Sequence, residues 1–335
     1  MKAIVIRVFG GPEVMEYEEV PTPEPGEGEV LMAVHAVSVN RTLDLAVRAG
    51  TYVRKPTLPH VLGVDPVGII AKVGPGVTGP KVGDRVTSGS ALGSAPAAGG
   101  VLGVTRWGGY ADFVTLPAQN CFHIPEGLGF PEACVVARHF PTAFYQLRVR
   151  AELKAGEWLL VMGAAGGLGA CLVQVGKLMG AKVIGAAGAD ERVKMARELG
   201  ADHGVNYRRQ DLAAEVMRIT DGAGVNVVSE NIADPTLWPG AFNSLARNGR
   251  LVTAGAHGGG KVELDVNRLY LNALRVIGGT GQTREDFDAS LKAAAEGKLR
   301  APIDRVIPLR EAAKAHAALA KGGMLGKIIL DPTMK

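Results

Sequence analysis

The chain has 335 residues, of which 47% are hydrophobic and 21% charged, and its formal net charge is +4. This length suffices for about two domains with sizeable cores, and the composition is that of an ordinary globular protein. Lys and Arg form no block that would favour nucleic-acid binding, and no apolar run approaches the roughly 20 residues of a membrane helix. Three well-separated cysteines argue against a disulfide framework, and the N-terminus has no signal-peptide pattern. We therefore expect a cytoplasmic protein with no nucleic-acid or membrane partner.

The first 125 residues or so are predicted to be rich in β-structure. The expected strands are Lys2–Val8, Glu29–Val39, Val61–Val73 and Arg85–Ser88. Clusters of Gly and Pro separate them, and a short helical stretch interrupts them at 40–48. Short strands at this spacing favour a compact barrel or sandwich. Residues 89–109 form a long loop of low complexity, whose residue types do not distinguish a functional lid from a disordered segment.

From about residue 128 to 280 the pattern changes to alternating strands and helices, which indicates a parallel, doubly wound α/β sheet. The expected strands are 158–162, 181–186, 203–206, 225–229, 250–254 and 274–278, and the helices are 168–179, 190–199, 210–219 and 236–246. Later elements are a helix at 284–296, a strand at 306–309, a helix at 311–319 and a strand at 326–330. We expect this tail to return to the β-rich domain. The domains would then be 1–127 completed by 281–335, and 128–280.

The stretch from Trp158 to Gly169 is the strongest functional signal in the chain. An apolar run, Trp158–Met162, is followed by the turn Gly163-Ala-Ala-Gly-Gly-Leu-Gly169 and then by apolar residues at helical spacing. At the start of such a helix, unpaired backbone N–H groups and the helix dipole favour an anion, and glycines let a pyrophosphate approach. Ala164 stands where the usual G-x-G-x-x-G motif has its first glycine. The prediction therefore depends on the strand before the turn and the helix after it. We predict a dinucleotide site here.

The end of the second predicted strand bears on the choice of cofactor. An NAD site normally has a carboxylate there, about 20 residues after the glycines, but Gly185–Ala189 contains none. Asp190 and Glu191 follow, where an N-cap and a first-turn acid of the next helix explain them. Cations come next, at Arg192, Lys194, Arg208 and Arg209. A missing acid and nearby cations favour NADPH over NADH, although a solvated helix face would explain each cation taken singly.

Several motifs together resemble one known family. They are Val39-Asn-Arg-Thr-Leu-Asp44, Gly50-Thr-Tyr52, Leu62-Gly-Val-Asp-Pro-Val-Gly68, Val82-Gly-Asp-Arg-Val86, the glycine turn, Gly200-Ala-Asp-His-Gly-Val-Asn-Tyr207 and Gly326-Lys-Ile-Ile-Leu330. Over almost its whole length the chain is similar to zinc-free medium-chain dehydrogenase/reductases of the quinone oxidoreductase, or zeta-crystallin-like, group. The resemblance implies a β-rich GroES-like catalytic domain, a Rossmann domain that binds NADPH, and a homodimer or tetramer.

The resemblance also implies roles for individual residues. Positions for the cofactor are Arg192 and Tyr207 at the 2′-phosphate, Gly166, Gly167 and Leu168 at the pyrophosphate, and, elsewhere on the cofactor, Thr142, Ala165, Gly188, Asn231, Gly255, His257 and Lys327. For His257, a plain loop histidine is an open alternative. Asn40, Asp44 and Tyr52 match positions near the nicotinamide, and Arg138 and His139 could face the substrate. The chain departs from the family at Glu230 and Ala233, where Asp and Gly are usual.

A metal site is not expected. Zinc-dependent relatives use a Cys and a His at the positions that Asn40 and Val64 occupy, and neither of these side chains is a credible zinc ligand. The four closely spaced cysteines of a structural zinc lobe are also missing from residues 89–109. An improvised site made of His60, Asp65 and His139 stays open as a minor alternative.

Without a metal to polarise a carbonyl, conjugated acceptors are the easier substrates. We therefore expect an enzyme that transfers hydride from NADPH to a quinone or an α,β-unsaturated carbonyl. The Tyr52 hydroxyl and the Asn40 amide would donate hydrogen bonds to the developing oxyanion, and Asp44 is expected to order its turn rather than to act as a base. Open alternatives are an alcohol dehydrogenase and a non-enzymatic cofactor- or RNA-binding protein. The apolar stretch Leu269–Ile277 would be an edge strand for pairing between subunits, or simply buried.

Overall fold

A computed structural model describes residues 1–41, 43–89, 100–322 and 326–334, and its contacts divide the chain into two compact units. Unit 1 comprises Met1–Arg138, Phe287–Gly297 and Ala301–Lys335, and unit 2 comprises His139–Asp286 and Lys298–Arg300. The division falls within helices α2 (Phe130–Phe144) and α8 (Arg284–Ala295), whereas the sequence pattern placed it ahead of both.

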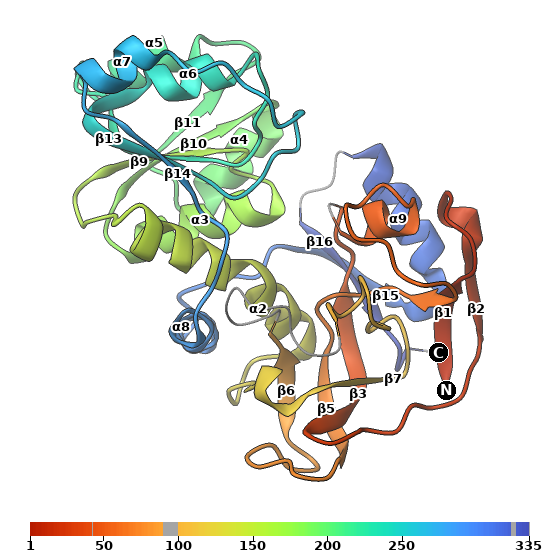
Figure 1. Cartoon of the computed structure of the whole chain (residues 1–335). Coiled ribbons are helices and arrows are strands. Elements are labelled where there is room, and N and C mark those ends of the chain that lie inside the picture. The colour runs from red at the N-terminus through yellow and green to blue at the C-terminus, as the bar shows by residue number, and fades with distance from the viewer. Residues whose placement is uncertain (42, 90–99, 323–325, 335) are drawn as a thin grey trace. The chain divides into compact units, whose positions relative to one another are not determined.

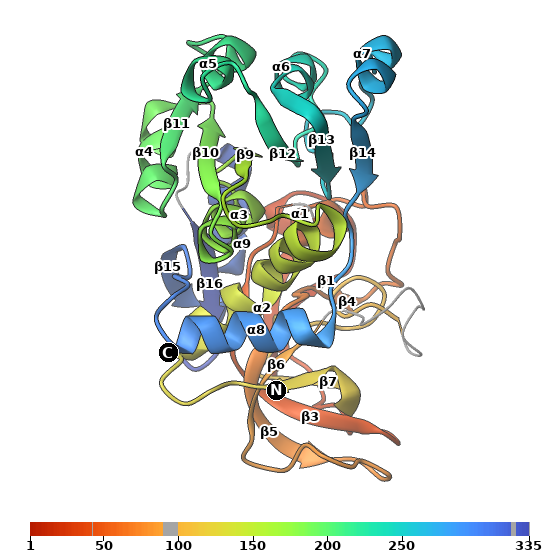
Figure 2. The same cartoon turned by 90° about the vertical axis from the view of Figure 1, so that its left-hand side faces the viewer.

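Unit 2 contains the predicted doubly wound sheet, six parallel strands in the order β11-β10-β9-β12-β13-β14. Its strands are β9 Trp158–Met162, β10 Lys182–Ala187, β11 His203–Asn206, β12 Val225–Glu230, β13 Leu245–Thr253 and β14 Arg275–Gly278. Its helices are the π-helical η3 Tyr145–Arg150, α3 Gly167–Leu178, α4 Asp190–Glu198, α5 Leu212–Ile219, α6 Trp238–Asn243 and α7 Val266–Leu271. Helices α3 and α4 lie on one face of the sheet, and α5, α6 and α7 lie on the other (Figure 1). The strand order is seen directly in Figure 2.

Burial explains why these segments form a parallel sheet. From Leu159 to Met162 the β9 side chains are almost completely buried, as expected for a strand that helices cover on both faces. Strands β10 and β11 are added to one side of β9, and β12, β13 and β14 are added to its other side. The strand order therefore has a switch point between β9 and β12. In such sheets ligands bind beyond the carboxyl ends of the strands at this switch point. The glycine turn after β9 and the residues after β12 therefore lie where a ligand is expected to bind.

Unit 1 is built on two sheets. One has three strands in the order β2-β1-β4, and the other has the order β15-β16-β3-β5-β6-β8, with β7 also paired to β3. The strands are β1 Lys2–Ile6, β2 Met15–Glu19, β3 Glu29–Ser38, β4 His60–Val61, β5 Val67–Val73, β6 Arg85–Ser88, β7 Phe113–Pro117, β8 Cys121–His123, β15 Ile303–Pro308 and β16 Lys327–Asp331. The short helices are η1 Pro12–Val14, α1 Asp44–Arg48, η2 Ala118–Asn120, η4 Leu309–Glu311 and α9 Ala312–Lys321. The C-terminal tail thus returns to the sheet of the N-terminal strands, where β16 pairs with β3.

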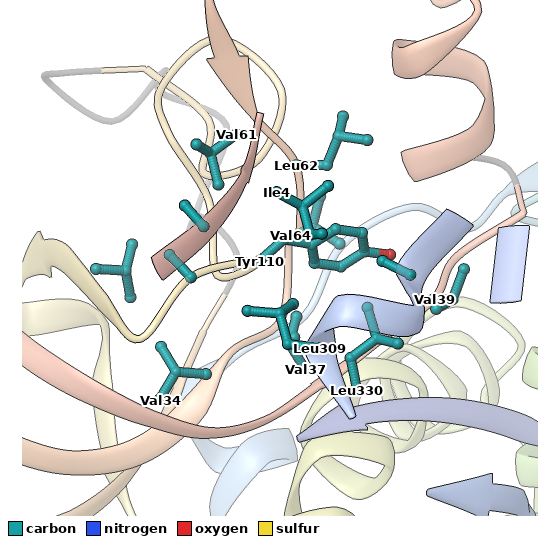
Figure 3. Packing of buried hydrophobic residues seen from close by; sticks show 14 of the residues in the cluster. Ile4, Val34, Val37, Val39, Val61, Leu62, Val64, Tyr110, Leu309 and Leu330 are labelled. Atoms are coloured by element: carbon teal, nitrogen blue, oxygen red, sulfur yellow. The ribbon is translucent and has the colours of Figure 1, made fainter. Parts of the chain in front are cut away.

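The core of unit 1 gathers aliphatic side chains from both sheets around one aromatic ring. Tyr110 is fully buried in it, and Ile4, Leu62 and Val64 pack nearby (Figure 3). Leu330 of β16 belongs to the same cluster. At roughly 25 cal/mol per Å² of apolar surface, each such side chain contributes about 1.5–3 kcal/mol to stability. The tail is therefore part of the core and not an appendage.

Three sequence predictions were wrong in their boundaries. The expected strand Val61–Val73 is two strands, because Gly63 has a φ of 99°, Pro66 has no N–H donor, and the chain passes here from one sheet to the other. The helix expected at 236–246 ends at Asn243, and β13 begins at Leu245. The edge strand expected from Leu269 is confined to β14, since residues up to Leu271 belong to α7. Of the loop at 89–109, residues 90–99 lie outside the described residues.

Candidate functional site

In unit 1 a buried polar cluster surrounds Asn40, which follows β3 and is 3% exposed. Its amide Nδ2 lies 3.0 Å from Oδ2 of Asp65 and 3.2 Å from Oγ of Ser38, and it donates to both. Its Oδ1 accepts a hydrogen bond of 2.5 Å from Nζ of Lys327. The Asp65 carboxylate also accepts the backbone N–H and the hydroxyl of Ser38. Both ends of the Asn40 amide are therefore occupied within the protein.

Asp44 and Lys327 supply opposite charges to this cluster. Asp44 Oδ2 accepts the backbone N–H of Asn40 at 2.8 Å, and Oδ1 accepts that of Gly63 at 3.2 Å. Burial, and then the charge of Asp65, raise the pKa of Asp44 to about 7. Burial likewise lowers the pKa of Lys327, while Asp65 opposes that shift. Asp44 thus bonds backbone N–H groups, which is the turn-ordering role considered from the sequence.

Tyr52 lies apart from these hydrogen bonds. It is half-buried against the unit 1 core, and its backbone N–H donates to the carbonyl of Ala46 in α1. Its hydroxyl has no hydrogen-bond partner among the residues that the structure describes. The structure therefore brings Asn40, Asp44 and Lys327 together and leaves Tyr52 outside their hydrogen-bonded cluster.

Side chains suited to a metal do not gather in the described part of the chain, where no three His, Cys, Asp or Glu residues form a possible ligand group. Asp65, one member of the minor alternative, has both oxygens engaged by Ser38 and Asn40. His60 is buried in β4, and its Nε2 has no partner among the described residues. Burial lowers the pKa of His60, so its ring is neutral at pH 7.

In unit 2 the glycine turn after β9 is tight and leads directly into helix α3. Gly163 has a φ of 64°, which favours glycine, and a Cβ on Gly169 would lie 2.1 Å from the carbonyl oxygen of Gly163. Helix α3 has Gly166 as its N-cap, without a side-chain cap, and both Gly166 and Gly167 are exposed. The N–H groups of the first turn are open to an anion. A Cβ on Gly167 would lie 3.2 Å from Nε2 of His139, so this imidazole stands beside the turn.

The carboxyl end of β10 brings together a tyrosine and two arginines. A Cβ on Gly188 would lie 3.1 Å from the hydroxyl of Tyr207 and 3.2 Å from Nε of Arg208. Burial raises the pKa of Tyr207, and the charges of Arg208 and Arg192 partly oppose this shift. Gly188 is therefore closely covered by the Tyr207 ring and the Arg208 guanidinium. Arg208, noted in the sequence only as one of several cations, belongs with Tyr207 and Arg192.

The acid that follows β10 is used within the protein. Asp190 Oδ1 accepts a hydrogen bond of 2.5 Å from Nδ2 of Asn206, and its Oδ2 pairs with Arg209 at 2.6 Å. Asp190 begins α4 as a first-turn acid, but the N-cap position belongs to Ala189. The prediction of an N-cap at Asp190 was thus wrong by one position.

Beyond β12 and β13 a second polar network holds Asn231. Its Oδ1 accepts hydrogen bonds from Nε2 of Gln146 at 3.2 Å and from the backbone N–H of Ala254, also at 3.2 Å. The Ser229 hydroxyl donates to Gln146 Oε1, which closes the network. A Cβ on Gly255 would lie 2.6 Å from the Asn231 carbonyl and 3.3 Å from Nε2 of His257, so three expected cofactor residues adjoin one another.

The other positions named from the sequence lie in the loop after β12, on α2 and in the glycine turn. Glu230, at the family's usual Asp, turns back to accept the backbone N–H groups of Ile232 and Ala233, so it orders this loop. Thr142 is half-buried on α2. In the glycine turn, Ala165 is buried and Leu168 half-buried.

Sequence reasoning missed Ser38 and Gln146. Ser38 is the last residue of β3 and Gln146 lies in η3, and both are fully buried polar residues whose partners are far away in sequence. No local pattern marks either of them. Asp65 was named only as a possible metal ligand, whereas its carboxylate organises the Asn40 cluster.

Comparison with known proteins agrees with both units. A family model described as alcohol dehydrogenase GroES-like domain matches residues 26–126, and one described as zinc-binding dehydrogenase matches residues 167–296. The quinone oxidoreductase of Homo sapiens is 32% identical, over 98% of this chain and 97% of its own length. A solved NAD-dependent alcohol dehydrogenase is 34% identical with a TM-score of 0.90, covering 99% of each chain. A solved 2-haloacrylate reductase is 30% identical with a TM-score of 0.83, covering 100% of each.

These matches confirm the resemblance, the GroES-like domain and the Rossmann sheet. The described residues contain no helix long and apolar enough to cross a membrane. The glycine turn and the loops after β10 and β12 fit a nicotinamide dinucleotide, the cofactor that the family implies. The chain belongs to the medium-chain dehydrogenase/reductase family of oxidoreductases, in its quinone oxidoreductase group.

Proposed function

We propose that the chain is a metal-free reductase that uses NADPH to reduce a quinone or an α,β-unsaturated carbonyl compound. The observation that carries the proposal is the environment of Asn40. Where zinc-dependent relatives have a cysteine ligand, this chain has an amide whose Oδ1 accepts from Lys327 and whose Nδ2 donates to Asp65. The similarity to proteins named quinone oxidoreductase and 2-haloacrylate reductase supports the class of acceptor.

The group of cations after β10 supports NADPH over NADH. Tyr207 and Arg208 lie together at Gly188, Arg192 is the further cation that we assign to the 2′-phosphate, and Asp190 is already paired with Arg209. Arginine suits phosphate because its planar guanidinium donates two hydrogen bonds at once. The proposed pyrophosphate contacts are Gly166, Gly167 and Leu168, and the proposed contacts to the rest of the cofactor are Thr142, Ala165, Gly188, Asn231, Gly255, His257 and Lys327.

The bound cofactor supplies a hydride. An enone takes that hydride at its β-carbon and a proton at its α-carbon, and a quinone takes one hydride and one proton to become a hydroquinone. In both cases negative charge would develop on a carbonyl oxygen of the acceptor, where a hydrogen-bond donor of this chain would stabilise the transition state. We assign this donor to the Tyr52 hydroxyl, which no described residue engages.

Asn40 takes a different part in the proposed site from the one expected. The Asn40 side-chain N–H groups donate to Asp65 and Ser38, so we no longer assign them to the oxyanion. We assign to Asn40 the role of holding Lys327, which donates to its Oδ1. The Lys327 ammonium donates to Asn40 Oδ1 and to the carbonyl of Val39, and an ammonium has three N–H donors. One N–H is therefore left for the cofactor or the acceptor.

The first test of this function measures NADPH oxidation with one quinone and one enone, after dialysis against a strong chelator and with zinc content determined by elemental analysis. We expect turnover with at least one acceptor at unchanged rate and with substoichiometric zinc. Turnover that disappears on chelation and returns with added zinc would contradict the metal-free site and favour an alcohol dehydrogenase. Failure to oxidise NADPH with either acceptor would contradict the proposed substrate class.

We further propose a homodimer that forms through the edge of the unit 2 sheet. Among the described strands β14 pairs with β13 alone, and exposed apolar side chains lie on β14 and on α7 before it, including Val276 and Tyr270. An edge strand with unpaired backbone groups and an apolar surface is a ready partner for a second copy.

Sedimentation equilibrium tests this interface. The wild type should have the mass of a dimer, and Val276→Lys should shift the protein toward the monomer by placing a charge on the edge strand. Leu178→Lys is the matched control, since both side chains are 41% exposed but Leu178 ends α3. A monomeric wild type, or a dimer unaffected by Val276→Lys, would contradict the proposal.

A cytoplasmic location is also proposed. The three cysteines, Cys121, Cys134 and Cys171, are free and buried, and free thiols are typical of reducing compartments. Cell fractionation with detection of the native protein is the direct check.

A further inference from the structure

Gln146 is a fully buried glutamine of unit 2 whose amide lies at the carboxyl end of β12. It belongs to η3, and its Nε2 donates to Oδ1 of Asn231 at 3.2 Å, while its Oε1 accepts the hydroxyl of Ser229 at 3.0 Å. Nδ2 of Asn231 in turn donates to the Ser229 hydroxyl oxygen at 3.3 Å. These three side chains therefore form a closed ring of hydrogen bonds.

The surroundings of the ring fix which way round the Asn231 amide lies. The backbone N–H of Ala254, directly after β13, donates to Asn231 Oδ1 at 3.2 Å, and an N–H donor can meet only the oxygen of an amide. Nδ2 then faces Ser229, to which it gives one of its two hydrogens. The other Nδ2 hydrogen has no acceptor in the described part of the chain. Asn231 thus retains one N–H donor just beyond β12, at the switch point of the strand order.

The segment that carries Gln146 is attached to the end of β14. Nε of Arg150, also in η3, donates to the carbonyl of Gly278 at 2.8 Å, and a Cβ on Gly279 would lie 3.0 Å from Cγ of Gln146. Gly279 also donates its N–H to the carbonyl of Thr253 in β13. Gln146 is therefore packed against the residue after β14 and hydrogen-bonded to residues at the end of β12. The π-helical turns of η3 are rare in proteins and are frequently found at functional sites.

We propose that Gln146 is a positioning residue of the cofactor site, which holds the Asn231 amide so that its remaining N–H donates to an oxygen of the bound dinucleotide. The inference rests on the proposed function for the presence of that cofactor, and it adds the residue that orients one of its contacts. Without the Gln146 amide, Asn231 Oδ1 would keep only the Ala254 N–H, and the buried Ser229 hydroxyl would lose its acceptor. The Asn231 amide would be held less firmly, so affinity for the cofactor should fall.

Gln146→Glu makes the ring dependent on pH. A protonated glutamic acid has the shape of glutamine, so its O–H can donate to Asn231 while its carbonyl accepts from Ser229. The ionised form can only accept, and it would place a negative charge against the Asn231 oxygen. Burial raises the pKa of a carboxyl, so the ring should be intact in acid and should break as the pH rises. Gln146→Leu, in contrast, removes both hydrogen bonds at every pH.

The test measures the dissociation constant of NADP⁺, which is stable in acid, by titration calorimetry from about pH 5.5 to about pH 8.5. Each variant is compared with the wild type at the same pH, so that ionisation of the 2′-phosphate cancels. Gln146→Leu should bind about 10-fold more weakly at every pH. Gln146→Glu should match the wild type at the acid end and bind at least about 10-fold more weakly at the alkaline end.

Asn226→Asp is the matched control, because it introduces a carboxyl near the other end of β12. Oδ1 of Asn226 accepts the backbone N–H of Trp158, and an aspartate can accept the same bond. Its affinity relative to the wild type should not change with pH. Gln146→Glu with wild-type affinity at alkaline pH, or without recovery in acid, would overturn the inference. If Gln146→Leu does not fold, Gln146→Glu decides, since its protonated form reproduces glutamine.

The same measurements separate this inference from the proposed function. A wild type that binds NADP⁺ but reduces neither a quinone nor an enone would reject the proposed reaction, while recovery of Gln146→Glu in acid would still support the positioning role. Turnover by the wild type together with an affinity of Gln146→Glu that does not follow the pH would support the reaction and reject the positioning role. A wild type that binds no NADP⁺ would reject both.

Discussion

Gly169→Ala is expected to abolish cofactor binding. The added Cβ would lie 2.1 Å from the carbonyl oxygen of Gly163 and 2.8 Å from its carbon, and real contacts of this kind do not occur. Both neighbours are backbone atoms, so relief requires α3 to move away from the turn, and with it the N–H groups that would hold the pyrophosphate. We expect the affinity for NADPH to fall at least about 100-fold, or about 2.7 kcal/mol, with loss of turnover.

The measurement is a fluorescence titration with NADPH, with thermal unfolding to separate binding from stability. NADPH should raise the Tm of the wild type but not that of Gly169→Ala. Gly278→Ala is the control, because a Cβ there meets no atom within 4 Å and the residue lies on the β14 edge. Gly169→Ala with wild-type affinity for NADPH would show that the turn is not the pyrophosphate site.

Gly188→Asp is expected to reverse the preference between the two nicotinamide cofactors. A Cβ at this position points at the Tyr207 hydroxyl and at Nε of Arg208, 3.1 and 3.2 Å away. A carboxylate there would pair with Arg208, repel a 2′-phosphate and accept the ribose hydroxyls of NADH. We expect kcat/KM for NADPH to fall about 100-fold and that for NADH to be unchanged or higher, so the ratio of the two measures the effect.

Gly188→Ala separates charge from size at the same position. It should lower kcat/KM for both cofactors modestly and leave their ratio close to that of the wild type. Arg208→Ala should weaken NADPH alone, because NADH has no phosphate at this position. A preference for NADPH that survives both Gly188→Asp and Arg208→Ala would place the 2′-phosphate elsewhere.

The Rossmann half of the fold was predictable because its signals are local. Strand β9 and the turn to Gly169 form one continuous stretch, and the glycines that the turn requires are visible as glycines. The absence of an acid from Gly185–Ala189 is also a local observation, and Arg192, Lys194, Arg208 and Arg209 follow within 20 residues of it in the sequence. Helix and strand alternate over the same region, which gives the parallel sheet.

The site in unit 1 was harder to predict, because its hydrogen bonds join distant segments. Asn40, Asp65 and Lys327 lie on different elements, and their partnership depends on β16 pairing with β3. The resemblance to the family identified Asn40 and Asp44 as expected site residues. Only the structure shows that the Asn40 amide is hydrogen-bonded to Lys327 and Asp65.

The strand expected at Val61–Val73 illustrates the same limit. Its apolar residues fit one long strand, and the sequence gives no sign that the two ends join different sheets. The break between β4 and β5 places Gly63 beside Asp44 and Asp65 beside Ser38, so the irregular segment carries the polar contacts. Functional sites are where local patterns and the final structure are expected to disagree.

The most direct test of the account follows the hydride itself. Chelated, zinc-free protein is given NADPH labelled with deuterium at the transferable position of the nicotinamide, together with an enone, and the product is analysed by mass spectrometry and NMR. We predict a saturated ketone with one deuterium on the former β-carbon. Deuterium on the carbonyl carbon, as in an allylic alcohol, or transfer that occurs only after zinc is added, would contradict a metal-free reductase of conjugated acceptors.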